Sequence, residues 1–276
     1  MLRKMVTDYS DQFETIQCRF DQETGIGRIV LNRPDSLNAM SMQTLDEIPT
    51  AIDTFDQLDR DNEGISVRSL ILSGAGDEAF SVGVDVNEIG EEQYPFTASS
   101  FREALFSVES FGAPVIAEID GYCVGGGLEL ALMCDFRLAS EDSELGFPEV
   151  DLGIFPSGVG TTQRLPLLIG PSRAKELCMT GEFLSGSQAD SEGLINQSYP
   201  VEELSDAVDE FATELAGKPP LALRAIKDTI NQSRNIGLRD GIEYEYRAYL
   251  PLLNTEDYEE GAEAFSSDRD PEWQGK

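Results

Sequence analysis

Three consecutive glycines at positions 125–127 place the strongest local constraint on what this chain can fold into. The apolar run at positions 114–117 predicts a buried strand, and the helix formers at positions 128–133 predict a helix. Glycine lets a backbone approach a ligand closely, and the first N–H groups of a helix have no partner within it. The stretch therefore predicts a helix N-terminus that can stabilise an anion or a carbonyl oxygen gaining negative charge. A tight turn with a structural role only is the alternative.

Two acidic residues are candidates for acid–base chemistry beside this loop. Glu129 lies in the first turn of the predicted helix, and Glu149 follows twenty residues later in a Phe-Pro-Glu sequence. Each also has a simple alternative, because the helix dipole favours any first-turn acid and a loop acid is ordinarily solvated. The chain has no histidine, which excludes a Ser-His-Asp or Cys-His nucleophile and a histidine base. Acid–base chemistry must therefore use carboxylates, tyrosine, lysine or water.

Five sequence motifs occur in one order along the chain. GYCVGGGLELALMCDFRLAS at 121–140 and PEVDLGIFPSGVGTTQRL at 148–165 contain the two candidate acids. VLNRP with LNAM at 30–40, and FSVGVDV at 80–86, precede them. The fifth is the C-terminal pattern of Glu256, Asp257, Glu260, Gly261, Ala264 and Phe265. Together these motifs resemble the crotonase superfamily and within it the enoyl-CoA hydratases, and the resemblance spans roughly residues 14–273.

The resemblance implies an α/β fold, the crotonase (ClpP-like) spiral of repeated ββα units with a helical C-terminal trimerisation region. Recurring strand, loop and helix signals support crossover connections in the first part of the chain. We therefore expect an α/β core over residues 1–200 and a helical region over 201–276 that mediates oligomerisation and covers the active site. The predicted helices after residue 171 are 172–180, 201–216, 221–234, 238–253 and 256–267.

The N-terminal part shows further local patterns. β-rich runs at 15–20 and 26–32 predict a hairpin-like opening. Apolar residues recur at helical spacing over 41–61, where Pro49 predicts a kink or a late helix start. Short strands are predicted at 67–72 and 114–119, with a helix at 97–111 between them.

The resemblance also implies the site residues. The backbone N–H groups of Val84 and Gly126 would form an oxyanion hole for a thioester oxygen, and Glu129 and Glu149 match the two catalytic glutamates of the hydratases. No metal and no cofactor is expected, because coenzyme A is part of the substrate. The other candidate substrate- and CoA-binding residues are Arg33, Leu37, Ala39, Val82, Asp85, Val86, Gly125, Pro148 and Ser157.

Three positions depart from the pattern of similar hydratases. Ser157 replaces a glycine whose main-chain N–H helps to organise the site; serine keeps that N–H, so we expect activity with an altered acyl preference. Asn87 and Asp35 stand where basic residues are common near the CoA phosphates. Because CoA is anionic, we expect weaker CoA binding at low salt, with Arg33 still in reach of the nucleotide.

The net charge of −32 is distributed along the chain rather than gathered in a tail. A surface this negative repels itself unless salt screens it, and at ~1 M salt the Debye length is about 3 Å. We therefore expect a protein from a salt-accumulating halophile; an acidic mesophilic protein is the alternative. Nucleic-acid binding is not expected, because phosphate contacts need clustered positive charge.

Cysteine usage and hydropathy predict an intracellular protein. Cys18, Cys123, Cys134 and Cys178 show no CxxC spacing and are expected to be reduced and buried. No segment approaches the ~20 apolar residues of a membrane span. The N-terminus lacks the apolar region of a secretory signal, so a cytoplasmic location is expected.

The resemblance, with both glutamates in place, implies an enoyl-CoA hydratase that adds water reversibly across the 2,3 double bond of trans-2-enoyl-CoA thioesters. The expected partners are the acyl-CoA substrate and further copies of the chain, in a homotrimer or homohexamer. Alternatives are an enoyl-CoA isomerase, another superfamily enzyme acting on a branched or aromatic acyl-CoA, and a protein that only binds acyl-CoA. An isomerase typically needs one carboxylate, so the pair favours water addition.

Overall fold

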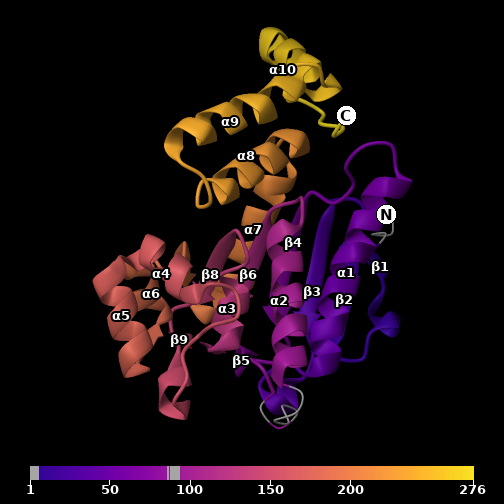
Figure 1. Cartoon of the computed structure of the whole chain (residues 1–276). Coiled ribbons are helices and arrows are strands. Elements are labelled where there is room, and N and C mark those ends of the chain that lie inside the picture. Colours follow the sequence, from indigo (N-terminus) through magenta and orange to yellow (C-terminus); the bar gives the residue numbers. More distant parts are fainter. Residues whose placement is uncertain (1–5, 86, 88–93) are drawn as a thin grey trace.

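The computed structural model describes residues 6–85, 87 and 94–276, which form two β-sheets with helices around them (Figure 1). The strands are β1 (Val6–Asp8), β2 (Ile16–Asp21), β3 (Ile26–Leu31), β4 (Ser69–Gly74), β5 (Ala79–Ser81), β6 (Val115–Ile119), β7 (Tyr122–Val124), β8 (Phe136–Ser140), β9 (Glu144–Gly146), β10 (Phe183–Ser185) and β11 (Gln197–Tyr199).

Short 3-10 helices and longer α-helices connect and cover these strands. They are η1 (Ser10–Gln12), η2 (Pro34–Ser36), α1 (Met42–Asp61), α2 (Tyr94–Ser110), α3 (Gly126–Ala131), η3 (Pro148–Leu152), α4 (Thr161–Ile169), α5 (Pro171–Thr180), α6 (Gly186–Glu192), α7 (Val201–Ala216), α8 (Pro220–Gln232), α9 (Leu238–Leu252) and α10 (Glu256–Ser267).

The order of the strands confirms the predicted repeat. A seven-stranded sheet has the order β1-β2-β3-β4-β6-β8-β11, and a four-stranded sheet has the order β10-β9-β7-β5. Each of β4, β6 and β8 belongs to the larger sheet and is followed by a short strand of the smaller one, then by a helix. These are ββα units, and their strands pair in parallel within each sheet. The predicted hairpin at the start is confirmed as the antiparallel pair β2–β3.

One strand near the glycine loop escaped prediction. The expected strand at 114–117 is β6, but β7 stands between it and the glycines. The chain turns at Gly121, which has φ 69°, and a Cβ there would lie 2.1 Å from the carbonyl oxygen of Glu78. A three-residue strand carries no alternation that a pattern could reveal. The glycines therefore follow a strand of the small sheet and not of the large one.

Pro49 does not delay the start of its helix, so that part of the prediction is wrong. α1 begins at Met42, and the Ser41 hydroxyl oxygen caps it by accepting the N–H of Thr44 at 3.1 Å. The cap and an apolar face in the main core hold the helix across the proline. That face consists of Leu45, Ile48, Ala51, Ile52 and Phe55.

Two edge strands and a short helix after residue 180 were also not predicted. β10 and β11 are three residues long and close one edge of each sheet. α6, between them, starts with a capping box in which Ser185 and Gln188 exchange side-chain and backbone hydrogen bonds. Through β10 and β11, the chain after α5 is hydrogen-bonded to both sheets.

The larger sheet is covered on both faces. One face contributes to the main core, where the rings of Phe20, Phe55 and Phe111 pack together. On the other face Ile71, Ile116 and Leu138 pack against three buried residues of α7: Leu204, Val208 and Ala212. α7 is therefore part of the packed body, and the predicted boundary near residue 200 stays a prediction.

Helices α8–α10 stand together at one end of the molecule, beyond α7 (Figure 1). The C-terminal tail fastens them to the body. Trp273 donates its indole N–H to the Gly217 carbonyl at 3.0 Å, and Arg68 donates to the Trp273 carbonyl at 3.0 Å. Buried Asp257 of α10 accepts the N–H of Gly275 at 3.0 Å. Helices α8–α10 therefore form one unit, the arm, and hydrogen bonds of the C-terminal tail attach it to the rest of the molecule.

Two further expectations concern the cysteines and the membrane. The four thiols are free; three are buried and Cys178 is half-buried. Within residues 6–85, 87 and 94–276, no helix combines the length and apolar character needed to cross a membrane.

Candidate active site

Two loops meet where the oxyanion hole was predicted. The segment after β5 carries Gly83, whose φ of 93° favours glycine, and α3 begins at Gly126. A Cβ placed on Gly83 would lie 2.8 Å from the backbone nitrogen of Gly126, closer than real Cβ contacts come. Likewise a Cβ on Gly127 would lie 2.1 Å from the Ser81 carbonyl oxygen. Glycine at both positions is therefore required for the two backbones to approach.

The amide of Val84 is oriented by a parallel β-bridge with Met40. Met40 donates to the Gly83 carbonyl at 2.7 Å, and its own carbonyl accepts the N–H of Asp85 at 2.9 Å. In such a bridge the N–H and C=O of the central residue point to the opposite side. The Val84 amide thus points away from Met40, and within the described part of the chain neither it nor the Gly126 amide has a hydrogen-bond partner.

Glu129 is a buried carboxylate held by one of its two oxygens. Its Oε1 accepts the N–H of Gly158 at 3.1 Å and the hydroxyl of Thr161 at 2.6 Å. Burial raises the pKa of Glu129, while the Thr161 hydroxyl and the amides of Gly158 and Val159 oppose that rise. Two donors on one oxygen favour the ionised form.

Glu149 lies in η3, directly after Pro148, and its surroundings are different. Its Oε1 is 3.3 Å from the position of a Cβ on Gly125, so the carboxyl faces the glycine loop. Its Oε2 is buried without a hydrogen-bond partner among the described residues. Burial raises the pKa of Glu149 to about 7, the negative charge of Glu129 adds to the rise, and its own backbone amide opposes it. This carboxyl is therefore suited to carry a proton near neutral pH.

The structure brings the predicted acids and amides together, and it adds a residue that the motifs did not reveal. The ring of Phe101, from α2, lies between the oxyanion loop and the loop before α4. A Cβ on Gly126 would lie 3.2 Å from this ring, and one on Gly158 only 2.1 Å. Phe101 is 6% exposed, and it keeps both loops in place by filling the space between them. No local pattern marks a single aromatic residue in a helix as part of a site.

The first predicted CoA-binding loop is cross-linked to the oxyanion loop. Arg33 donates to the Ala39 carbonyl at 2.7 Å and pairs with Asp85 at 3.0 Å. The Val82 amide donates to the Leu37 carbonyl at 3.2 Å. These residues therefore shape the backbone beside Val84, and their contact with CoA stays a prediction. Val86 lies outside the described residues.

The three positions that differ from the pattern of similar hydratases lie on the surface. Asp35, Asn87 and Ser157 are all exposed. The N–H that reaches Glu129 belongs to Gly158, the residue after Ser157, so the organising amide is one position later than expected. Over the described residues no group of three or more His, Cys, Asp or Glu side chains has the arrangement of a metal site.

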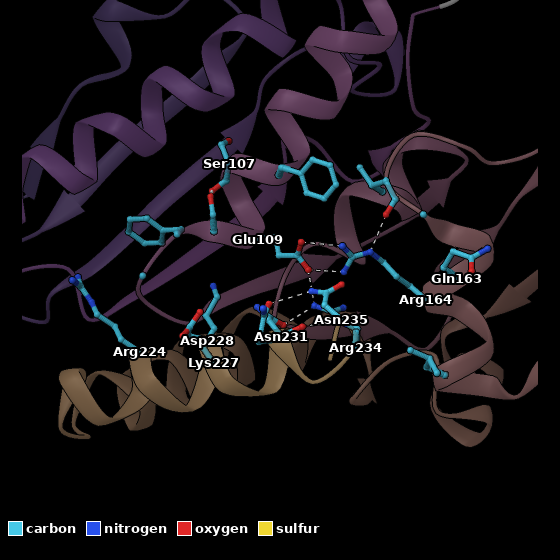
Figure 2. A pocket seen from close by; sticks show the side chains of 18 of the residues that line it. Ser107, Glu109, Gln163, Arg164, Arg224, Lys227, Asp228, Asn231, Arg234 and Asn235 are labelled. Atoms are coloured by element: carbon cyan, nitrogen blue, oxygen red, sulfur yellow. Dashed lines mark hydrogen bonds and ion pairs between the residues drawn. The ribbon is translucent and has the colours of Figure 1, made fainter. Parts of the chain in front are cut away.

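A hollow of about 940 Å³ lies between α2, α4 and α8, and several charged side chains line it (Figure 2). Glu109 accepts from Arg164 at 2.9 Å and from Arg234 at 2.7 Å. Nearby, Lys227 of α8 pairs with Asp135 at 2.7 Å. Neither candidate glutamate lines this hollow, and its ion pairs attach the arm to the body.

Comparison with known proteins agrees with this geometry. The family model for enoyl-CoA hydratase/isomerase matches residues 21–276. A probable mitochondrial enoyl-CoA hydratase of Dictyostelium discoideum is 37% identical over 252 residues, covering 91% of this chain and 88% of that protein. An enoyl-CoA isomerase/hydratase of Mycosarcoma maydis is 38% identical over 258 residues, covering 92% and 94%.

The fold is shared as well. The crystal structure of an enoyl-CoA hydratase from Bacillus anthracis has a TM-score of 0.88 with this chain at 37% identity, covering 95% of this chain and all of that one (100%). The fold and nearly the whole length of the sequence thus agree with these relatives. The chain belongs to the enoyl-CoA hydratase/isomerase family of enzymes.

Proposed function

We propose that the protein is an enoyl-CoA hydratase that adds water reversibly across the 2,3 double bond of trans-2-enoyl-CoA thioesters. One observation carries the proposal: two glutamates in unlike surroundings lie beside the glycine loop, where two backbone amides have no partner among the described residues. Relatives named as hydratases support the same reaction. The proposed reaction needs neither a metal nor a redox cofactor.

The amides of Val84 and Gly126 bind the thioester oxygen in this proposal. When oxygen attacks C3, the electrons of the double bond shift toward the thioester and place negative charge on that oxygen. Backbone donors already aimed at the oxygen stabilise this charge without reorganising, an effect worth roughly 10²–10³ in rate per donor. Because the donors are main-chain groups, the side chain at position 84 has little influence on them.

The two glutamates divide the proton transfers. Ionised Glu129 takes a proton from water as the hydroxyl adds at C3, and protonated Glu149 delivers a proton to C2. The two hydrogen bonds to Glu129 support its role as the base, and the raised pKa of Glu149 supports its role as the acid. Hydration leaves Glu129 protonated and Glu149 ionised, and proton exchange with solvent restores both.

An enoyl-CoA isomerase is the second candidate, because one relative is named as an isomerase/hydratase. An isomerase moves a proton between two carbons and needs one carboxylate, whereas hydration uses two. A protein that only binds acyl-CoA would need neither.

The first prediction separates these candidates. Glu129→Gln and Glu149→Gln keep the side-chain shape and remove the ionisable group, so each should slow hydration of crotonyl-CoA by about 10²–10⁴-fold. Because the two residues act as a unit, the double variant should lose far less than the product of the single losses. Loss of absorbance of the conjugated thioester measures the rate.

Binding provides the control. A non-hydratable acyl-CoA should bind all variants with similar affinity, since the proposed oxyanion donors are backbone groups. An isomerase would convert 3-enoyl-CoA far faster than it adds water, and one of the two single substitutions would have almost no effect on its activity. Near-wild-type hydration in either single variant would contradict the assignment of the pair.

We also propose a homotrimer or homohexamer built through the arm. Its helices expose apolar side chains that a monomer would leave in water, among them Leu238 at 84% and Phe265 at 91% exposure. The others are Ile226, Ile230, Ile242, Tyr246, Tyr249, Leu250 and Tyr258.

The second prediction tests this assembly. Sedimentation at micromolar concentration in concentrated KCl should give a trimer or a hexamer. Phe265→Glu should weaken the assembly, whereas Val6→Glu, a matched change at an exposed residue of β1, should leave it intact. A monomeric wild-type protein would overturn the proposal.

The charge of −32 supports adaptation to a salt-rich cytoplasm. The third prediction is that the melting temperature rises and the KM for crotonyl-CoA falls as KCl increases from dilute toward molar, because screening relieves repulsion. Salt screens the half-buried Asp135–Lys227 ion pair less than it screens exposed charges, so this pair should persist. Values that stay flat over this range would contradict salt adaptation and leave the hydratase proposal untouched.

A further inference from the structure

Thr161 is a buried residue beside Glu129 that the sequence motifs did not single out. It is the first residue of α4, its exposure is 0%, and its hydroxyl lies 2.6 Å from Oε1 of Glu129. An ionised carboxylate only accepts hydrogen bonds, so the hydroxyl is the donor. This distance is typical of a charge-assisted O–H···O bond.

The same carboxylate oxygen also accepts the N–H of Gly158, at 3.1 Å. The amide of Val159 also favours the charged form of Glu129. One oxygen is thus anchored from the α4 side, and in the proposed reaction the other receives the water molecule. A carboxylate fixed at one oxygen keeps a single rotamer, which is what proton abstraction from a positioned water requires.

The loop that supplies these donors is itself fixed. Arg164 donates to the Val159 carbonyl at 2.9 Å and is in turn held by Glu109. Gly158 lies against the ring of Phe101, which prevents a side chain there. The anchoring donors therefore occupy a rigid position relative to Glu129.

We propose that Thr161 is a positioning residue: its hydroxyl holds Glu129 in the ionised, water-facing orientation. The effect of Thr161 on the reaction rate rests on the proposed hydration. Its effect on the orientation and ionisation of Glu129 does not. A merely structural role would depend on the shape of the side chain, which valine reproduces, and not on the hydroxyl.

Two other titratable groups of the described chain interact electrostatically with Glu129. They are Glu149 from η3 and the Cys178 thiol from α5; burial raises the pKa of Cys178, and the charges of Glu149 and Glu129 raise it further. Both are retained in the variants below. A change in the titration of Glu129 between these variants can therefore be assigned to residue 161.

The fourth prediction compares Thr161→Val with Thr161→Ser. Valine removes the donor, so kcat for crotonyl-CoA should fall by about 10- to 100-fold, the worth of a hydrogen bond to a charged group, with little change in KM. The ionised base becomes harder to form, so the acidic limb of the pH–rate profile should move to higher pH by about one to two units. Serine keeps the hydroxyl and should stay close to wild type in both measurements.

A substrate-free measurement separates this inference from the proposed function. Infrared titration of the Glu129 carboxyl, identified by its loss in Glu129→Gln, should give a higher pKa in Thr161→Val than in wild type or Thr161→Ser. An unchanged Glu129 titration in a folded Thr161→Val protein would overturn the role of Thr161, and so would equal losses in the valine and serine variants. An absence of hydration in the wild type would instead overturn the proposed function.

Discussion

The close approach of two backbones, at Gly83 and Gly126, is the constraint on which the rest of the site depends. A side chain at Gly83 would collide with the amide nitrogen of Gly126. The Met40–Val84 bridge then turns the Val84 amide to the side that Met40 does not occupy. Both sheets are needed for this arrangement, because β5 and β7 carry the two loops while β4 and β6 of the larger sheet precede them. The ββα repeat thus places two amide donors side by side without any side chain.

In the proposed mechanism, the two glutamates have different roles although they are the same residue type. Burial raises the pKa of both carboxyls, but Glu129 has a hydroxyl and backbone amides that favour its charge. Glu149 has a buried oxygen without such a donor among the described residues, and the neighbouring charge favours its protonated form. The difference comes from α4 and the loop before it, which contact Glu129. The proposed base and the proposed acid are therefore distinguished by their neighbours and not by their residue type.

Much of the fold and part of the site could be predicted from the sequence. Long periodic segments, such as α1 and α7, follow from apolar spacing, and the glycines with Glu129 and Glu149 follow from motifs. The strands β7, β10 and β11 have three residues each, too few for a pattern, and were missed. Phe101 and Thr161 also escaped prediction, because their importance lies in contacts with Gly158 and Glu129 that only the tertiary structure creates. The predicted late helix start at Pro49 was wrong, because the Ser41 cap and the packing of α1 in the core stabilise the helix across the proline.

The protonation state of Glu149 tests the account most directly. Infrared difference spectra between wild type and Glu149→Gln, recorded from about pH 5 to about pH 9, isolate its carboxyl band. The account predicts a protonated carboxyl that titrates near its raised pKa of about 7, and a lower midpoint in Glu129→Gln because that change removes the neighbouring negative charge. A Glu149 carboxyl that is already ionised at the acidic end of this range would contradict the proposed division between acid and base.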